Sequence, residues 1–369
     1  QYSGAGATVC TVCAGGLYID DDSIDASNHL SCDTCPVGKY SVAGAAACIQ
    51  CPKGMYNGEV GQSGAGSCKT CPTGMYNAAT GANVCVDCEA GTYIIDAGKY
   101  AAEHITCKIC ASGYWSSAGA TVCTACVSGM YLEDDGLDKA MHNEVGDCTV
   151  CGSGRYSAAG ARACDKCVPG KYLLDEGTDA VHHTAISKCL DCAYGQYAPD
   201  WGTTACTLCS KGRYNDLEGQ SEPSACVVCS SGRYAASTGL QTCTGQCSAG
   251  TYLADEGVDE TLHDAASDCL ICSAGEYSSA GAKSCLDCEA GKYLTDAATT
   301  ASAHDHVDKC LACATGQYSD AKAKACVDCD AGTYNTQTGQ AHRTACLVCA
   351  NGQHSSAGAT LCTDCVAGK

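Results

Sequence analysis

The cysteines of this chain occur in closely spaced pairs that repeat from one end to the other. Eighteen pairs have the spacing Cys-x-x-Cys and one, Cys243/Cys247, has one residue more; together they use all 38 cysteines. A glycine stands three residues after each pair, and an aromatic residue, nearly always tyrosine, stands two residues after that glycine. One short module has therefore been copied along the chain, and its function is to be sought in the array.

Composition excludes an ordinary globular interior. The chain has no Phe, two Trp and four Met, whereas cysteine is about a tenth of its residues. Such a chain cannot bury a large apolar core, so covalent crosslinks are expected to replace burial. We expect small disulfide-rich repeats, forming an elongated solenoid or rod of short β-hairpins and loops with little helix. The cysteine content also predicts an oxidising location, extracellular, secreted or at the cell surface.

The net charge of the chain restricts the kinds of molecule that it can bind. The formal net charge is −20, and no basic stripe exists to neutralise phosphates, which argues against nucleic acid and anionic membranes. Cations and basic partners stay open. No run of 18 apolar residues appears, so we expect no membrane span in this chain. Because the sequence starts and stops within a module, we expect it to be a slice of a longer product.

The spacing of the pairs alternates between short steps of 16 or 17 residues and long steps of 20 to 26. The repeating unit is thus a doublet, and in the later half three doublets form a superunit of 120 residues, as from Cys123 to Cys243. We therefore divide the chain into residues 1–122, with an irregular superperiod, residues 123–242, one superunit, and residues 243–369, a second superunit truncated within a module.

Two chemistries compete for the cysteines. Paired Cys-x-x-Cys motifs can close a tetrahedral zinc site, and their spacing here is near the zinc-ribbon range. Against zinc, the number of pairs is odd and the stretched pair would distort a site. We favour disulfides, whose connectivity the sequence does not fix. A bond within each pair would be strained and would hold no modules together.

We therefore predict a chain-forward ladder, in which the second cysteine of one pair bonds the first cysteine of the next. Each short bridge closes a loop of about 14 residues and stabilises the fold by about 3 kcal/mol in the entropy model. Cys10 and Cys365 stay unpaired and would bond modules beyond the slice or other subunits. The predicted bridges include Cys13–Cys32, Cys35–Cys48, Cys51–Cys68, Cys71–Cys85, Cys110–Cys123, Cys151–Cys164, Cys192–Cys206 and Cys272–Cys285.

Residues 35–48 read Cys-Pro-Val-Gly-Lys-Tyr-Ser-Val-Ala-Gly-Ala-Ala-Ala-Cys. This motif resembles the ephrin-receptor-like cysteine-rich repeat, which is akin to the modules of growth-factor and tumour-necrosis-factor receptors, and the resemblance extends in tandem along the chain. It implies an extracellular, disulfide-bonded, elongated array. The chain departs from the pattern because only Pro36, Pro52 and Pro72 keep the proline after the second cysteine. No kinase, ephrin-binding lobe or death domain is visible, so receptor signalling does not carry over.

The recurring tyrosines are expected to pack over neighbouring disulfides and seal adjacent modules, with sugar stacking or dityrosine crosslinking as alternatives. Serines and threonines in the turns suit O-glycans. The tyrosines assigned to this structural role are Tyr40, Tyr56, Tyr76, Tyr156, Tyr252 and Tyr277.

Four long loops place clustered carboxylates before a histidine, the first between Asp20 and His29. Asp138 and His142 are four residues apart, which suits one helical turn. The plain interpretation is a solvated insertion or subunit contact. The alternative is Ca²⁺ at subunit contacts, or a transition metal with the histidine. The candidate ligands are Asp135, Asp138, His142, Asp255, Asp259 and His263.

No constellation typical of catalysis recurs, and no other cofactor is expected, so we expect no enzyme. The favoured function is a structural extracellular fibre or filament, self-assembling at a cell surface or appendage. The alternative is an adhesive or ligand-binding stalk of a surface receptor. A zinc-storage protein is a third hypothesis, which titration of free thiols would test.

Overall fold

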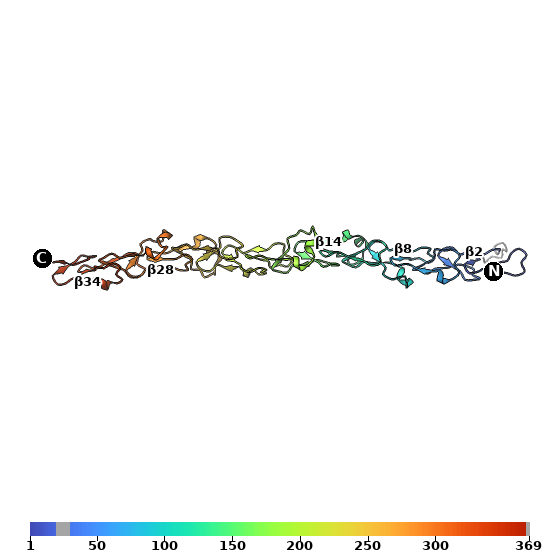
Figure 1. Ribbon diagram of the computed structural model, residues 1–369, viewed down its shortest axis with the longest axis horizontal. Helices are drawn as coiled ribbons and strands as arrows, with labels where there is room; N and C mark the ends of the chain where they lie inside the picture. The colour runs from blue at the N-terminus through green and yellow to red at the C-terminus, as the bar shows by residue number, and fades with distance from the viewer. Residues whose placement is uncertain (20–29, 367–369) are drawn as a thin grey trace. The chain divides into compact units, whose positions relative to one another are not determined.

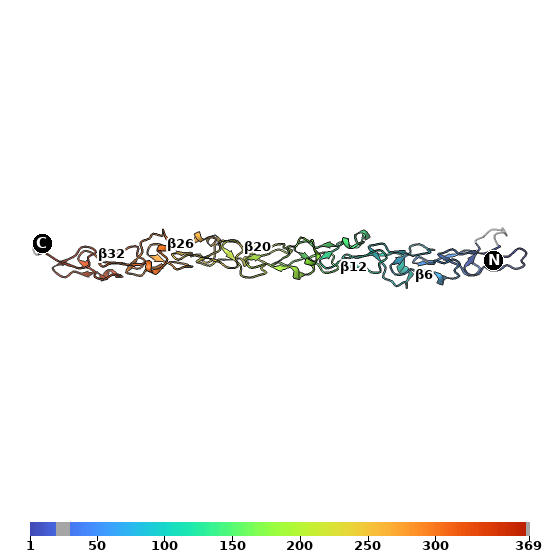
Figure 2. The same ribbon diagram turned by 45° about the horizontal axis from the view of Figure 1, so that its top comes forward.

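A computed structural model of the chain describes residues 1–19 and 30–366. It divides into two compact units, of which unit 1 comprises Gln1–Cys167 with Leu173–Cys189, and unit 2 comprises Val168–Tyr172 with Leu190–Lys369. Each unit is a succession of two-stranded hairpins in chain order (Figures 1 and 2). The three segments inferred from the sequence superperiod describe repetition rather than packing, and that division stays a prediction.

Every strand is two residues long, and every hairpin is antiparallel. The eight hairpins of unit 1 are β1 (Leu17–Tyr18) with β2 (Asp33–Thr34), β3 (Lys39–Tyr40) with β4 (Ile49–Gln50), β5 (Met55–Tyr56) with β6 (Lys69–Thr70), β7 (Met75–Tyr76) with β8 (Val86–Asp87), β9 (Thr92–Tyr93) with β10 (Lys108–Ile109), β11 (Tyr114–Trp115) with β12 (Thr124–Ala125), β13 (Met130–Tyr131) with β14 (Thr149–Val150), and β15 (Arg155–Tyr156) with β16 (Asp165–Lys166).

The hairpins of unit 2 repeat this design. They are β17 (Lys171–Tyr172) with β18 (Leu190–Asp191), β19 (Gln196–Tyr197) with β20 (Thr207–Leu208), β21 (Arg213–Tyr214) with β22 (Val227–Val228), β23 (Arg233–Tyr234) with β24 (Gly245–Gln246), β25 (Thr251–Tyr252) with β26 (Leu270–Ile271), β27 (Glu276–Tyr277) with β28 (Leu286–Asp287), β29 (Lys292–Tyr293) with β30 (Leu311–Ala312), β31 (Gln317–Tyr318) with β32 (Val327–Asp328), β33 (Thr333–Tyr334) with β34 (Leu347–Val348), and β35 (Gln353–His354) with β36 (Thr363–Asp364).

In residues 1–19 and 30–366, helix is limited to single 3₁₀ turns in the long loops. In unit 1 they are η2 (Ala65–Ser67), η3 (Ala101–His104), η4 (Lys139–Met141), η5 (Val145–Asp147), η6 (Ala180–His183) and η7 (Ile186–Lys188). In unit 2 they are η8 (Pro223–Ala225), η9 (Glu260–Leu262), η10 (Ala266–Asp268), η11 (Ala301–Ala303), η12 (Val307–Lys309) and η13 (Arg343–Ala345). The prediction of small disulfide-rich hairpin repeats with little helix is therefore confirmed.

The sequence explains these elements locally. The residues between the two cysteines of a pair form one strand, and the residue before the tyrosine forms the other with it, so Tyr277 pairs with Leu286 across β27 and β28. The glycine before each such strand has a positive φ, for example +80° at Gly275, which glycine adopts without strain. The Gly-x-Tyr motif thus supplies the first strand of a hairpin and the next Cys-x-x-Cys motif supplies the second, while the glycine forms the turn that precedes the hairpin.

The interior is made of sulfur and a few aliphatic side chains. Cys288 and Cys310 are buried with Leu294, and Tyr277 packs against them. Most other large aliphatic side chains lie on the surface, and Leu286 remains 56 % exposed. Among the described residues, no helix is long and apolar enough to cross a membrane.

Candidate functional site at the module junctions

A module is defined here as the chain from the second cysteine of one pair to the first cysteine of the next. The structure has 18 disulfides, and each one closes a module in this chain-forward order. Short modules span 13 or 14 residues between their cysteines and long modules 17 to 22. The bridges expected from the sequence are placed as Cys13–Cys32, Cys35–Cys48, Cys51–Cys68, Cys71–Cys85, Cys110–Cys123, Cys151–Cys164, Cys192–Cys206 and Cys272–Cys285. Cys10 and Cys365 are free and exposed.

Adjacent modules are joined by backbone hydrogen bonds that involve the turn glycine. The N–H of Gly250 donates to the carbonyl of Ser278 in the next module at 2.9 Å, and Gly129 does the same to Ser157. The tyrosine adds a parallel bridge to the next module, as between Tyr252 and Ala282. These bonds take up backbone groups that a two-residue strand cannot satisfy within its own hairpin.

A buried side chain adds one further bond at most junctions. The residue after the tyrosine is often serine or asparagine. Its side chain donates a hydrogen bond to a backbone carbonyl of the preceding module, that of the residue just before that module's tyrosine. Ser278 Oγ donates to the carbonyl of Thr251 at 2.9 Å, and Asn335 Nδ2 donates to that of Gln317 at 3.0 Å. Because both donors are buried, these bonds satisfy groups that have no access to water.

Within the described part of the chain, histidine replaces that donor in five long modules. There the residue after the tyrosine is leucine or isoleucine, such as Leu294, and it is buried in the module interior. The ring of His304, ten residues later, fills the donor position, with Nδ1 2.7 Å from the carbonyl of Glu276 in the preceding module. The five histidines are fully buried, and they are His104, His142, His183, His263 and His304.

The second ring nitrogen of each histidine faces an aspartate eight residues earlier. Nε2 of His304 lies 3.0 Å from Asp296 Oδ2, and Nε2 of His104 lies 3.1 Å from Asp96 Oδ2. The other three pairs are His142 with Asp134, His183 with Asp175, and His263 with Asp255. Both ring nitrogens thus have partners inside the protein.

The surroundings of each aspartate favour the ionised carboxylate. Hydrogen bonds from the Tyr100 backbone N–H and the His104 ring lower the pKa of Asp96. The Thr299 hydroxyl, the Thr300 N–H and the His304 ring lower the pKa of Asp296 to about 2. Charge-assisted hydrogen bonds of this kind stabilise the ionised form. The aspartates are partly exposed, so their outer edges remain in contact with water.

Comparison with known proteins places these modules. Residues 38–88 match the family model described as tyrosine-protein kinase ephrin type A/B receptor-like. The disulfide-closed modules continue in tandem on both sides of that match. The match and the tandem series of disulfide-bonded modules together support ephrin-receptor-like cysteine-rich repeats. No curated protein matches the chain.

The match and the tandem disulfides support a coarse description of the protein. Tandem ephrin-receptor-like modules held by many disulfides indicate an extracellular or cell-surface location and a structural or receptor-stalk role. The matched family is a receptor-like cysteine-rich module and not an enzyme family.

The ephrin-receptor-like modules also contact their second neighbours. An ideal Cβ at Gly250 would lie 1.9 Å from the carbonyl oxygen of Ala301, two modules later, and one at Gly113 would lie 2.2 Å from that of Gly160. Both glycines have a positive φ as well. These two turn glycines are therefore required for two independent reasons, backbone conformation and close approach.

The tyrosines assigned to a structural role lie at these contacts. Tyr156 packs against the buried Cys167, Leu173 and Cys189, and Tyr277 against the next module's disulfide in the same way. All six assigned tyrosines, Tyr40, Tyr56, Tyr76, Tyr156, Tyr252 and Tyr277, form a strand of their hairpins and are half-buried. Sugar stacking and dityrosine formation stay predictions.

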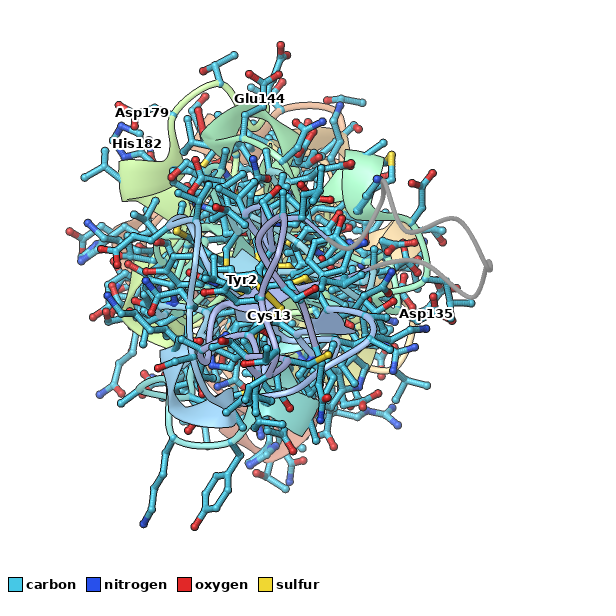
Figure 3. All side chains as sticks on the ribbon, turned by 90° about the vertical axis from the view of Figure 1, so that its right-hand side faces the viewer. Tyr2, Cys13, Asp135, Glu144, Asp179 and His182 are labelled. Atoms are coloured by element: carbon cyan, nitrogen blue, oxygen red, sulfur yellow. A yellow bond between two sulfur atoms is a disulfide. The ribbon has the colours of Figure 1, made fainter. Side chains whose placement is uncertain are left out.

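The residues proposed as metal ligands occupy two kinds of position. Asp135 is exposed. In Figure 3 it lies at the edge of the molecule, as do Glu144, Asp179 and His182, whereas Cys13 lies near the centre. Asp138 caps η4 by accepting from the Ala140 N–H, and Asp259 caps η9 through Thr261. Asp255 accepts from His263, and the rings of His142 and His263 are buried with protein partners.

No group of three or more metal-binding side chains is gathered anywhere in the described part of the chain. The first acidic loop, Asp20 to His29, lies outside the described residues. Calcium binding therefore stays a prediction, and calorimetry with millimolar calcium checks it. The prediction expects heat of binding that a chelator abolishes.

The histidine–aspartate pairs were missed in part by sequence reasoning. Asp134, Asp175 and the whole loops that contain His104 and His304 were not assigned to a site. A signal was nevertheless present, because each buried pair follows one pattern: Tyr-Leu or Tyr-Ile, then aspartate two residues after that aliphatic residue, then histidine eight residues after the aspartate. Modules with serine or asparagine after the tyrosine have no such histidine in their loops.

The lowered pKa of Asp296 predicts a loss of stability in acid. Because its pKa falls from the usual 3.8 to about 2 on folding, the stability it provides is fully present above pH 3.8 and is lost as the pH falls through about 2. Hydrogen exchange of residues 294–304 between pH 4 and pH 2 measures this loss. Asp296→Asn is expected to remove the pH dependence, and Asp216→Asn, at an exposed aspartate of a module without histidine, is the control. An unchanged slope in Asp296→Asn would contradict the assignment.

Proposed function

We propose that this protein is a structural component of an extracellular fibre, and that its copies assemble into filaments at a cell surface or appendage. The observation that carries the proposal is the unbroken series of junctions within each unit, where every module is closed by a disulfide and bonded to its neighbours. Such a series resists unfolding and proteolysis without a large core, and it can be lengthened by adding modules.

A second observation supports contact between copies. In unit 2 the residue after the first cysteine of a pair is repeatedly aliphatic. About half of the surface area of each of these residues is exposed to solvent. Exposed apolar surface that recurs along the chain in this way supports contact with other proteins where it forms a continuous patch. The set consists of Leu190 (56 % exposed), Val227 (51 %), Leu270 (58 %), Leu286 (56 %), Leu311 (56 %), Val327 (52 %) and Leu347 (54 %).

Electron microscopy of the purified full chain tests the proposal. We expect long uniform filaments and, in sedimentation, a concentration-dependent increase in mass without any added partner. Replacing Leu286 and Leu311 with aspartate should reduce assembly at least tenfold, since charge at an apolar contact is strongly unfavourable. Val258→Asp, at an exposed valine outside the set, is the matched control.

A strictly monomeric chain at all concentrations would refute the filament. If that monomer binds a ligand through one module, the chain is a receptor stalk instead.

A further inference from the structure

Two histidine junctions lie outside the loops for which calcium was considered, at His104 and His304. Each ring is fully buried and makes two contacts, one through Nδ1 with a backbone carbonyl and one through Nε2 with a carboxylate. For His304 the carbonyl belongs to Glu276 of the preceding module, and for His104 it belongs to Met75. The ring is therefore the side-chain connection between two modules at both places.

The chemistry of the two acceptors decides what the ring must carry for both contacts to be hydrogen bonds. A carbonyl oxygen can only accept a hydrogen bond, and an ionised carboxylate can only accept one as well. A neutral imidazole has a single N–H, so it can satisfy one of the two partners but not both. Both contacts of His304 are hydrogen bonds at the same time only when Nδ1 and Nε2 each carry a proton.

The groups around His304 hold the aspartate in its ionised form. Asp296 also accepts hydrogen bonds from the Thr299 hydroxyl and from the N–H groups of Thr299 and Thr300. Of the elements packed against the ring, η11 carries no charged residue. The Glu276 side chain on β27 is ion-paired with Lys322. An ionised carboxylate that is held by three other hydrogen bonds therefore faces Nε2 of His304.

The surroundings of His104 are equivalent. Asp96 accepts from the backbone N–H groups of Lys99 and Tyr100 as well as facing the ring. The strand that supplies the carbonyl, β7, has no charged side chain. On η3, the Glu103 carboxylate lies 3.6 Å from Lys108 Nζ.

We propose that His104 and His304 are proton-dependent clips between modules, which open as the pH rises, whereas the junctions made by serine or asparagine do not respond. When the ring loses one proton, Nε2 presents a lone pair to the carboxylate, or Nδ1 presents one to the carbonyl. Either contact becomes repulsive inside a buried site. The junction then opens to let water reach the ring, and one proton leaves to solvent for each clip that opens.

The chain contains both kinds of junction, which gives an internal comparison. The N–H of Ser278 donates to the carbonyl of His304, and the N–H of Asn77 donates to that of His104, so these two amides report on the clips. The N–H of Gly316 donates to the carbonyl of Asn335 and reports on an asparagine junction. Hydrogen–deuterium exchange of the full chain, corrected for the intrinsic effect of pH on exchange, measures the opening of all three.

One proton per clip sets the expected size of the effect. The opening equilibrium at Ser278 and Asn77 should rise by up to about tenfold per pH unit over the titration, while that at Gly316 stays constant. Equal slopes at all three amides, or no slope at Ser278 and Asn77, would overturn the proposal.

The variant Asp296→Asn isolates the proton. Its side-chain amide can donate to Nε2, so a neutral ring with a proton on Nδ1 keeps both hydrogen bonds. The clip at Ser278 should stay closed and lose its pH dependence, while the clip at Asn77 keeps it. Asp96→Asn should give the reverse pattern and provides the second test if one variant folds poorly. Retention of the slope at Ser278 in Asp296→Asn would refute the clip.

Discussion

Replacing Gly250 with alanine should destabilise the junction around it more than the same change at Gly332. Both glycines have nearly the same backbone conformation, with φ of +84° and +85°. An alanine Cβ at Gly250 would meet the Ala301 carbonyl oxygen at 1.9 Å, whereas one at Gly332 would meet nothing within 4 Å. The two variants therefore share the conformational strain and differ in the contact with the second neighbour.

The magnitudes separate the two effects. A left-handed conformation costs an L-residue about 1–2 kcal/mol, which is the expected loss for Gly332→Ala. Overpacking adds about 1–3 kcal/mol, so Gly250→Ala should lose about 2–5 kcal/mol of local stability. Thermal unfolding and hydrogen exchange of residues 248–254 and 300–305 measure the loss. Equal losses in the two variants would show that the close approach to Ala301 does not exist in solution.

Much of the hairpin could be predicted from the sequence because its causes are local. Paired cysteines, a glycine and a tyrosine recur at fixed spacing, and a two-residue strand on either side of a turn follows from them. The spacing of Asp138 and His142 suits one helical turn, and the structure has a 3₁₀ turn there, η4, with Asp138 as its cap. Local hydrogen-bonding propensity was sufficient for these features.

The contacts between second neighbours could not be predicted in the same way. Gly250 and Ala301 are far apart in sequence, and neither residue type indicates the other. The histidine–aspartate pairs are an intermediate case. Attention to carboxylate density selected Asp135 and Asp138, whereas the structure uses Asp134, whose only distinction is its place relative to Leu132 and His142. The number of carboxylates in a loop does not show which of them pairs with the histidine, because the pairing depends on the spacing between the aspartate and the histidine.

Removing one disulfide of a long module should open that module and release its clip. The bridge Cys288–Cys310 closes a loop that contains Leu294, Asp296 and His304, and its sulfurs are the main buried atoms beside Leu294. Replacing both cysteines with alanine should cost about 3 kcal/mol, because the unfolded loop of this length regains its conformational freedom. The loss of buried sulfur adds to this cost.

The expected result is local because each module contacts chiefly its neighbours along the chain. Hydrogen exchange should rise across residues 288–310 and at Ser278, whose N–H bonds to His304, but not at Gly129 in unit 1. Cys365→Ala, at a cysteine that is free in the structure, is the control and should change nothing. Peptide mapping of the unreduced wild type should recover a crosslink between the peptides of Cys288 and Cys310. A crosslink between Cys285 and Cys288 instead would refute the ladder, since a bond within one pair leaves the loop of residues 288–310 without the disulfide that closes it.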